Sequence, residues 1–535
     1  MKDVKFSVDD GEKVGVVGRN GVGKSTLFGI LSGKDTDYTG EVIFRRGITV
    51  ATTAQEHHGL GDQTVMSYIL GGLPEYSKLK KIIDEYPLTM GDNMRKIEEY
   101  TQALERFDQK GFYQVEEKIE RELSNFQLDG YGYRRISSLS GGQKRLVEIV
   151  KIMHSEAHLA LIDEPTNHMD YVAKQQFIDW MNSQPHQAML IITHDRDVLG
   201  QVDRIVEIKD GQAVSYRGNY DAYLKQNAQA TTAGMNNFEQ IEKRIVNLKQ
   251  KVLDYQRLKE KSRNPGTIQK FKRLENEARA ELEELSEMEK PTFWIDKESV
   301  GQLDYKSAER YGKFKSRNIR LSMKDASSRS QHVLVRAENV AVGIGERILF
   351  EDVNIDLREG EAIEIRGRNG AGKTTLIRMI LALGKSFDDG PVLYSGDIFL
   401  DPQVRIGVYE QEIDERYLSD PLEKAIEKLY MSRDLSISDT KIRQLLADYL
   451  FTDADRMTSL ARLSGGQKAR FQIIAMLAND PQLLILDEPT NHLDLPSIEE
   501  LETALTKYSG AILYVSHDNY FREKLGGKVV QIGAE

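Results

Sequence analysis

The chain repeats one ordered set of short motifs, once before and once after its middle. Each set opens with a glycine-rich loop of the pattern G-x-x-x-x-G-K-[ST], at residues 18–25 and again at residues 367–374. An apolar, strand-like run precedes each loop and a helical pattern follows it, which is the context that a phosphate-binding loop requires. A fixed motif order that recurs along one chain indicates internal duplication. The sequence of 535 residues therefore predicts an α/β protein with two nucleotide-binding domains, each built on a phosphate-binding loop (P-loop).

The two loops supply the first group of expected binding residues. Their glycines let backbone N–H groups close round phosphates, their lysine adds positive charge, and their serine or threonine hydroxyl binds Mg²⁺. The residues expected to bind nucleotide here are Gly18, Arg19, Asn20, Gly21, Val22, Gly23, Lys24, Ser25 and Thr26 in the first copy and Gly367, Arg368, Asn369, Gly370, Ala371, Gly372, Lys373, Thr374 and Thr375 in the second. Ser25 and Thr374 are also expected to be magnesium ligands.

A second motif, Leu-Ser-Gly-Gly-Gln, follows each loop and is expected to open a helix. A serine and two glycines at a helix N-terminus form an anion site, although so short a motif can arise by chance. Its position argues against chance, because in both copies it stands equally far before a pair of carboxylates. The residues expected to bind nucleotide from this motif are Ser140, Gly141, Gly142 and Gln143 in the first copy and Ser464, Gly465, Gly466 and Gln467 in the second.

The carboxylate pairs end two apolar, strand-like runs, residues 159–162 and 483–486. In each pair we expect the aspartate to enter the magnesium shell and the glutamate to polarise water. The four carboxylates are Asp163, Glu164, Asp487 and Glu488. One further apolar run in each copy leads to a histidine, His194 or His517.

Residues 236–290, between the copies, have no duplicate and are predicted to form two helices folded back on each other. Apolar residues follow a heptad spacing in the first half and share one helix face in the second. The sequence Asn-Pro-Gly at 264–266 breaks any helix between the two halves. The apolar positions are Ile241, Ile245, Leu248, Val252 and Tyr255, then Ile268, Phe271, Leu274, Ala278, Leu282 and Leu285. We therefore expect a helical hairpin within a linker at 224–330 that joins domains at 1–223 and 331–535.

Charge is uneven along this hairpin. Between Arg257 and Arg273 the charged residues are basic except for Glu260, whereas acidic residues dominate from Glu275 to Glu289. A solvated helix face is the ordinary explanation of a charge run, but a cluster of cations at a turn also suits contact with a nucleic-acid backbone. Because the net charge is −11, such contact has to come from a local basic patch.

The two copies differ in two places. The segment between the phosphate loop and the Leu-Ser-Gly-Gly-Gln motif is longer in the first copy, and we place the insertion in a charged helical stretch at about 77–122. An ordinary loop-length difference and a functional arm remain equally open. Aligning the loops puts Met1 opposite Phe350, so we expect the first domain to lack its opening strand and the chain to be a truncated or mis-started version of a longer one.

Composition excludes several classes. The chain has no cysteine, which excludes disulfides and thiol chemistry. No run approaches the roughly 18 apolar residues that a membrane-spanning helix needs. We therefore expect a cytoplasmic protein without a membrane partner.

In both copies, the loop, the Leu-Ser-Gly-Gly-Gln signature, the carboxylate pair and the histidine together resemble ATP-binding-cassette ATPases. The sequences Asp-Glu-Pro-Thr-Asn-His-Met-Asp at 163–170 and Asp-Glu-Pro-Thr-Asn-His-Leu-Asp at 487–494 narrow the resemblance to the ABC-F family, as do the hairpin and Arg-Gly-Asn-Tyr-Asp-Ala-Tyr at 217–223. Members of that family are ribosome-associated translation factors, some of which confer antibiotic resistance by ribosome protection.

The resemblance implies an ATPase with two composite sites. Two cassettes of one monomer would close head-to-tail over two ATP molecules with Mg²⁺, so that each phosphate loop faces the signature of the other cassette. By position, Glu164 and Glu488 match the family's general bases, and His194 and His517 match its γ-phosphate contacts. The remaining magnesium and water contacts would be Gln55 and Gln411, which complete a metal set of Ser25, Gln55, Asp163, Thr374, Gln411 and Asp487.

The resemblance also implies a partner and leaves alternatives open. The partner would be the ribosome, with the hairpin turn, Arg257–Arg273, at ribosomal RNA or tRNA near the exit or peptidyl site. A translation factor and a resistance protein both fit, and the short turn favours the former. The ATPase subunit of a membrane transporter with a separate permease is the alternative from another class. One departure is Ile344 at the family's adenine-stacking position, with no such residue in the first copy.

Overall fold

The structure is a computed structural model that describes residues 4–53, 62–91, 93–167, 169–209, 211–288, 290–291, 293–301, 303, 305–321, 332–383, 391–410 and 413–533. Two compact units make up the chain. The first unit joins Met1–Tyr220 to Ile319–Glu535 and holds both cassettes, and the second is Asp221–Asn318. No helix in the described ranges is both long enough and apolar enough to cross a membrane.

A six-stranded sheet forms the centre of the first cassette, in the order β2-β3-β4-β1-β5-β6. All neighbours are parallel except β5 and β6. The strands are β1 (Lys13–Gly18), β2 (Val50–Thr52), β3 (Leu159–Asp163), β4 (Ala188–Ile192), β5 (Arg204–Lys209) and β6 (Gln212–Arg217). Every residue of β3 and β4 is buried, which explains their unbroken apolar sequence, because helices cover both faces of a parallel sheet.

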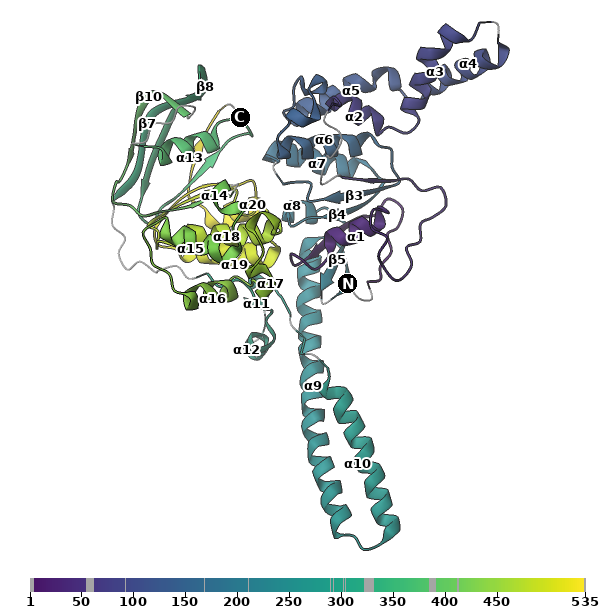
Figure 1. Cartoon of the computed structure of the whole chain (residues 1–535), viewed down its shortest axis with the longest axis vertical. Helices are drawn as coiled ribbons and strands as arrows, with labels where there is room; N and C mark the ends of the chain where they lie inside the picture. Colours follow the sequence, from purple (N-terminus) through teal and green to yellow (C-terminus); the bar gives the residue numbers. More distant parts are fainter. Residues whose placement is uncertain are drawn as a thin grey trace. The chain divides into compact units, whose positions relative to one another are not determined.

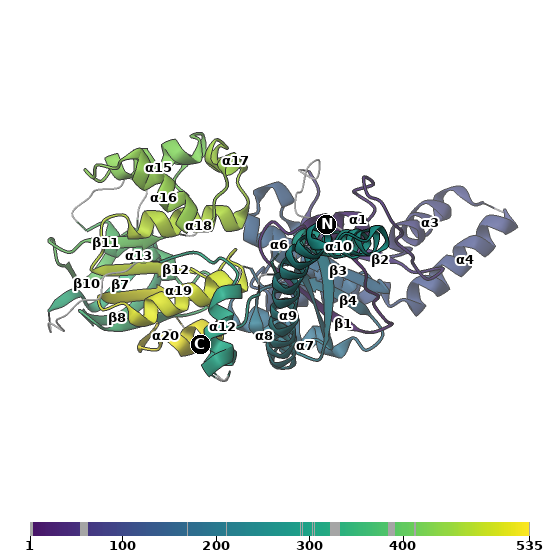
Figure 2. The ribbon, with the colours of Figure 1, turned by 90° about the horizontal axis from the view of Figure 1, so that it is seen from below.

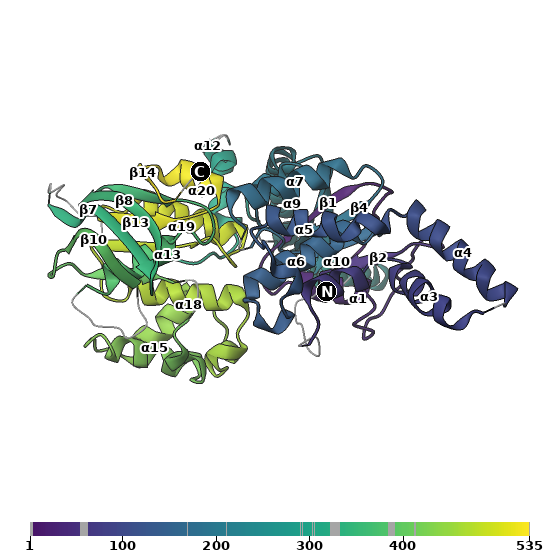
Figure 3. The same ribbon diagram turned by 90° about the horizontal axis from the view of Figure 1, so that it is seen from above.

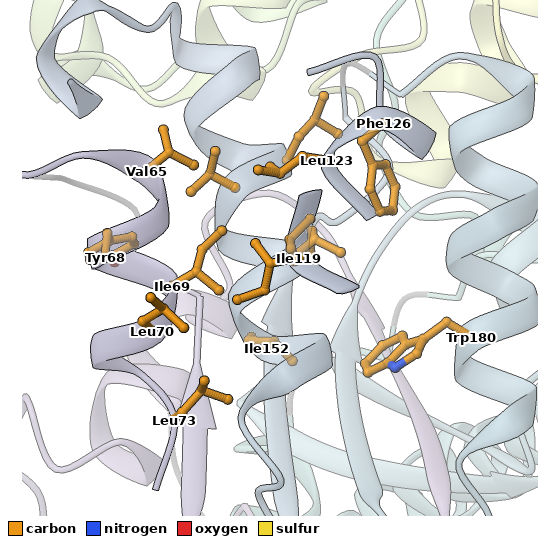
Figure 4. Close-up of a cluster of buried hydrophobic side chains, with 14 of the residues drawn as sticks. Val65, Tyr68, Ile69, Leu70, Leu73, Ile119, Leu123, Phe126, Ile152 and Trp180 are labelled. Carbon is orange, nitrogen blue, oxygen red and sulfur yellow. The ribbon is translucent and has the colours of Figure 1, made fainter. Parts of the chain in front are cut away.

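Helices of the first cassette surround this sheet and build a second core beside it. They are α1 (Lys24–Leu31), α2 (Val65–Gly71), α3 (Tyr76–Thr89), α4 (Met94–Gln109), α5 (Val115–Asn125), α6 (Gly141–His154), α7 (Tyr171–Ser183) and α8 (Arg196–Leu199), with 3₁₀ turns at Phe112–Gln114, Tyr131–Tyr133 and Ile136–Ser138. Figure 4 shows Ile69 of α2 directed toward Ile119 of α5 and Ile152 of α6. These three side chains are almost fully buried, so the signature helix α6 is fixed by apolar packing.

Helices α3 and α4 form the insertion in the first cassette. They pack against each other and extend away from the sheet of that cassette (Figure 3). The aromatic rings of Tyr76, Phe107 and Phe112 meet at their base, with centroids 5.2 to 5.6 Å apart. In the second cassette α15 is followed directly by α16, and its described residues contain no counterpart of α3 or α4.

The second cassette repeats the parallel sheet, in the order β11-β12-β13-β9-β14, and adds a three-stranded antiparallel sheet, β10-β7-β8. The strands are β7 (Val333–Ile344), β8 (Arg347–Arg358), β9 (Ala362–Arg366), β10 (Pro391–Leu400), β11 (Ile406–Tyr409), β12 (Leu483–Asp487), β13 (Ala511–Val515) and β14 (Lys528–Gln531). Residues 4–12 and 32–49 of the first cassette form no strand. Within the described residues, therefore, the antiparallel sheet exists only in the second cassette.

Helices again flank the second sheet. They are α13 (Lys373–Leu381), α14 (Glu415–Leu418), α15 (Leu422–Met431), α16 (Asp439–Asp448), α17 (Asp453–Arg456), α18 (Gly465–Leu477), α19 (Leu495–Lys507) and α20 (Asn519–Leu525), with a 3₁₀ turn at Leu460–Arg462. Helices α7 and α19 are duplicates, because each has 13 residues and an aspartate N-cap, Asp170 or Asp494. This pairing gives a residue-by-residue correspondence between the two cassettes.

The second unit contains the helical hairpin. Helices α9 (Tyr220–Lys261) and α10 (Pro265–Ser286) run side by side in opposite directions (Figures 1 and 2), and α11 (Lys297–Gly301) and α12 (Tyr305–Phe314) follow them. The break is where the Asn-Pro-Gly sequence places it, because the Asn264 side chain caps α10 by accepting from the Gly266 N–H. Two cassettes joined by a helical hairpin confirm the predicted fold class.

The hairpin is held by its predicted apolar seam and by one buried carboxylate. Leu248, Val252 and Ala278 are buried between the helices, and the rings of Tyr255 and Phe271 stack 6.4 Å apart. Glu275, which is 5% exposed, accepts hydrogen bonds from Lys259, Gln256 and Arg279. The pKa of Glu275 is lowered to about 2, and the hydrogen bond from Lys259 is the largest cause. The turn end of the hairpin is therefore tied by charge as well as by packing.

One boundary differs from the expectation, because α9 begins at Tyr220 rather than near residue 236. The extra stretch is rich in Ala, Gln and Thr and carries no heptad pattern, so periodicity did not reveal it. Gly234 within it allows close packing, since a Cβ there would lie 2.7 Å from a Phe293 ring atom. Ala and Gln favour a helix without any apolar stripe.

Candidate nucleotide sites

Both phosphate loops turn from a central strand into a helix through a glycine. Gly23 and Gly372 cap α1 and α13 with φ of 104° and 101°, a left-handed conformation that favours glycine. The Lys24 ammonium donates to the Gly18 carbonyl at 2.5 Å and to the Arg19 carbonyl at 3.2 Å. Lys373 makes the same two bonds in its own loop. Each lysine is thus held over a loop whose backbone N–H groups open a helix, an arrangement that attracts phosphate.

A hydroxyl and a carboxylate stand together beside each loop. The Ser25 hydroxyl donates to Asp163 at 3.4 Å, and the Thr374 hydroxyl donates to Asp487 at 2.8 Å. Burial raises the pKa of Asp487 to about 6. Two hard oxygen donors at one edge of the sheet suit Mg²⁺, which takes only one or two protein ligands beside phosphates. The other two expected metal contacts, Gln55 and Gln411, lie outside the described residues.

The glutamate that follows β3 or β12 faces the histidine that follows the neighbouring strand, β4 or β13. His194 Nε2 lies 3.6 Å from Glu164 Oε1, and His517 Nε2 lies 3.3 Å from Glu488 Oε1. Both glutamates have positive φ, 47° and 51°. Residues other than glycine rarely adopt this backbone, and it concentrates at functional sites. The charge of Lys24 acts on Glu164 and that of Lys373 acts on Glu488, so each carboxylate lies near its own phosphate loop.

Burial sets the protonation of these groups. It raises the pKa of Glu164 to about 8, with a smaller contribution from the Asp163 charge, and it raises the pKa of Glu488. Burial lowers the pKa of His194 and of His517 to about 3, with further lowering by Lys24 and Lys373 respectively. At neutral pH both imidazoles are therefore neutral. A glutamate whose pKa lies near neutrality is suited to accept a proton from water.

The raised pKa of Glu164 makes a prediction about stability. Its folded pKa of about 8 exceeds the unfolded value of 4.5, so the folded state loses stability as pH rises from about 4.5 to about 8. Glu164→Gln removes this loss and should stabilise the nucleotide-free protein by a few kcal/mol at pH 8 but by little at pH 5. Thermal unfolding at both pH values measures the difference, with Glu98→Gln on exposed helix α4 as the control. An equal effect at pH 5 and pH 8 would contradict the assignment.

The two signature motifs begin helices, as expected. Ser140 and Ser464 cap α6 and α18, and each shares a reciprocal capping box with its glutamine, Gln143 or Gln467. In these boxes the serine hydroxyl accepts from the glutamine N–H while the glutamine side chain accepts from the serine N–H. The motif is therefore a preformed helix N-terminus, not a flexible loop.

Each phosphate loop meets the signature side of the other cassette. One cavity of about 870 Å³ is lined both by Ser140–Gln143 and by Gly370, Lys373, Thr374, Glu488 and His517. At the other loop, a Cβ on Gly466 would lie 2.0 Å from Asn20 Nδ2. The structure thus brings together the expected residues of one composite site in a single cavity and seats the other loop against the opposite signature.

Two aspartates that the motif pattern alone did not assign complete these contacts. The Asn20 N–H donates to Asp494 Oδ2 and the Asn369 N–H donates to Asp170 Oδ2, each at 3.1 Å. Both bonds cross between the cassettes. Each aspartate ends the Asp-Glu-Pro-Thr-Asn-His-(Met/Leu)-Asp sequence, so the signal was present, but its partner lies on the other domain.

Buried polar atoms without partners test whether a nucleotide fits. Among the described residues, Nε2 of His194 and of His517 and Oε1 of Glu488 are buried and make no hydrogen bond. Such orphaned groups are costly unless a ligand satisfies them. Phosphate oxygens would accept from the histidines, and a water would donate to the glutamate, so the donor set fits a magnesium-bound nucleotide.

The base position is open in the second cassette. Ile344, at the end of β7, is 55% exposed and lines the cavity together with Arg347 and Leu349. An aliphatic side chain covers a purine ring by apolar contact but offers no aromatic stacking. In the described part of the first cassette no strand corresponds to β7.

A P-loop, a signature helix and an Asp-Glu pair, duplicated on facing α/β domains, define the class of ATP-binding-cassette proteins. The family model described as "ABC transporter" matches residues 1–167 and 350–491. The chain belongs to this family, and proteins of the ABC-F group are among its relatives. ATP binding, Mg²⁺ as the accompanying ion and ATP hydrolysis are general properties of this class.

The chain is similar in sequence to two relatives and in fold to one solved structure. It is 29% identical to ABC transporter F family member 2 of Arabidopsis thaliana, over 99% of this chain and 74% of the relative. It is 27% identical to the ribosome protection protein VmlR of Bacillus subtilis, over 98% of this chain and 82% of that protein. An archaeal ribosome recycling factor, aABCE1, solved with the ribosomal stalk protein aP1, superposes with a TM-score of 0.57 at 17% identity, over 99% of this chain and 84% of that one, and shares the fold.

Proposed function

We propose that the chain is a cytoplasmic ABC-F ATPase that hydrolyses ATP at two composite sites and acts on the ribosome. The observation that carries the proposal is the duplication of a complete site. Each cassette holds a lysine in its loop, a hydroxyl against an aspartate, and a glutamate against a histidine, and each loop meets the opposite signature side. Because neither set is degenerate, both sites are expected to turn over.

In the proposed reaction, the protein's own groups bind, orient and accept a proton. Backbone N–H groups of each loop and its lysine hold the β- and γ-phosphates of ATP. The neutral histidine donates from Nε2 to the γ-phosphate, which orients the phosphoryl group toward the glutamate. The glutamate accepts a proton from the attacking water. Ser25 with Asp163, and Thr374 with Asp487, would hold Mg²⁺, which neutralises charge on the phosphates.

The hairpin turn is the proposed contact with RNA. Glu275 engages Lys259 and Arg279, and Glu277 engages Arg273. Basic residues near the turn that are exposed and form no ion pair with another described residue are Arg257, Lys261, Arg263, Lys270 and Lys272. These cations are available for phosphates of ribosomal RNA or tRNA. The ribosome-directed names of relatives, such as the ribosome protection protein VmlR, support this partner.

The experiment that tests the proposal traps the closed, ATP-bound state. A double variant, Glu164→Gln with Glu488→Gln, should bind ATP without hydrolysing it and remain on ribosomes. We expect it to sediment with ribosomes in ATP and to be released when ATP is replaced by ADP. Lys24→Ala with Lys373→Ala, which should not bind ATP, is the matched control. Sedimentation of the double glutamine variant free of ribosomes in ATP would overturn the proposed partner.

A further inference from the structure

The turns at His194 and His517 meet at a buried lysine of the first cassette. The ammonium of Lys174, on α7, donates to the backbone carbonyl of His517 at 2.7 Å. It also lies 3.0 Å from Asp195 and 2.9 Å from Asp197, the residues just after His194. Its side chain is 5% exposed. We propose that Lys174 is a positioning residue that couples the two ATP sites by tying the turn that carries His517 to the turn that follows His194.

The contact is well placed to transmit motion between the sites. His517 faces Glu488 in one site and His194 faces Glu164 in the other. A shift of either turn would draw the ammonium away from at least one of its partners. Because a buried charge that loses its partner is strongly unfavourable, the two turns are expected to move together. Burial opposes the charge of Lys174, yet Asp195 and Asp197 outweigh it and raise the lysine's pKa, so the ammonium stays charged at neutral pH.

Two neighbouring contacts support the same link across the cassettes. Arg196, beside Asp195, donates to Glu502 on α19 at 2.8 Å, and both side chains are buried. Asn519, two residues after His517, donates to Asp197 Oδ2 at 2.8 Å. Asp197 therefore receives one bond from Lys174 of its own cassette and one from the other cassette.

The duplication is broken at this place, which argues that the link is not a general part of the ATP site. Lys174 is the fourth residue of α7, and the fourth residue of the duplicate helix α19 is Ile498. Arg196 stands two residues after His194, and Asn519 stands two residues after His517. Both cations thus come from the first cassette and have apolar or neutral counterparts in the second. Loop, signature, carboxylate and histidine positions, by contrast, are kept in both copies.

The inference rests on the proposed two-site hydrolysis, and its test compares single-site variants. ATP turnover is measured for Glu164→Gln and for Glu488→Gln, each alone and each combined with Lys174→Met. With Lys174 present, silencing one site should change total turnover by clearly more than about two-fold, because coupled sites are not additive. With Lys174→Met, each silenced site should remove about half of the turnover, and the Hill coefficient for ATP should fall toward 1.

Three further variants separate coupling from stability. Lys174→Arg keeps the charge and should restore the non-additive pattern, whereas Lys507→Met removes an exposed lysine from the matching helix α19 and should leave it unchanged. If Lys174→Met unfolds, Asp197→Asn weakens the same link and is tested for the same loss. Non-additivity that persists in folded Lys174→Met, or additive sites with Lys174 present, would overturn the inference alone. Absence of any ATP turnover would overturn the proposed function instead.

Discussion

Replacing both glutamates, Glu164→Gln with Glu488→Gln, should lower ATP turnover by about 10²–10⁴-fold while ATP binding is retained. The range is the usual contribution of a positioned general base. The structure gives the reason, because each carboxylate is held by a strained backbone with φ near 50° and faces a neutral histidine. A glutamine keeps the shape of the side chain but does not accept the proton of the attacking water.

Single-turnover phosphate release with excess enzyme is the measurement for this variant, together with ATP binding at equilibrium. Each single variant should leave turnover at the intact site, at a level set by the coupling between the sites. Glu98→Gln, on the exposed face of α4, should match the unmodified protein. Full ATP turnover in the Glu164→Gln, Glu488→Gln variant would show that neither glutamate acts as a general base.

The sequence predicted those site residues whose placement depends only on neighbouring residues in the chain. Asp163 and Asp487 are the last residues of β3 and β12, as expected for carboxylates that follow apolar runs. The loop glycines, the capping serines and the helix break before Pro265 also lie within a few residues of the signal that predicted them. Each of these features depends on one strand end or one helix start.

Contacts between distant segments were not predictable in the same way. Asp170 and Asp494 carry a recognisable local pattern, but their bonds to Asn369 and Asn20 require two folded cassettes. Lys174 lies in a helix with no motif, so only the fold places it beside His517. The start of α9 at Tyr220 was missed for another reason, since that stretch has helix-forming residues without an apolar period. Local pattern therefore predicts the groups of the site, and the packing of domains decides which groups are joined.

Neutralising the hairpin turn should weaken RNA binding strongly without slowing ATP hydrolysis. Arg263, Lys270 and Lys272 are exposed and near the turn. If each neutralises one phosphate, changing all three to Gln should make the negative slope of log affinity against log salt concentration shallower by about 2. Binding at 0.1 M salt should weaken on the order of 10²-fold. ATP turnover should persist in the free protein, because none of the three belongs to a nucleotide site.

The matched control removes the same number of charges from the same hairpin, farther from the turn. Lys243, Lys249 and Lys251 are exposed on α9, and changing them to Gln alters net charge by the same amount. Ribosome affinity measured across a salt series should fall for the turn variant and change little for the control. Equal loss in both would mean that binding follows total charge rather than the turn. No loss of ribosome affinity in either variant would mean that the hairpin turn does not contact RNA, whether or not the cassettes hydrolyse ATP.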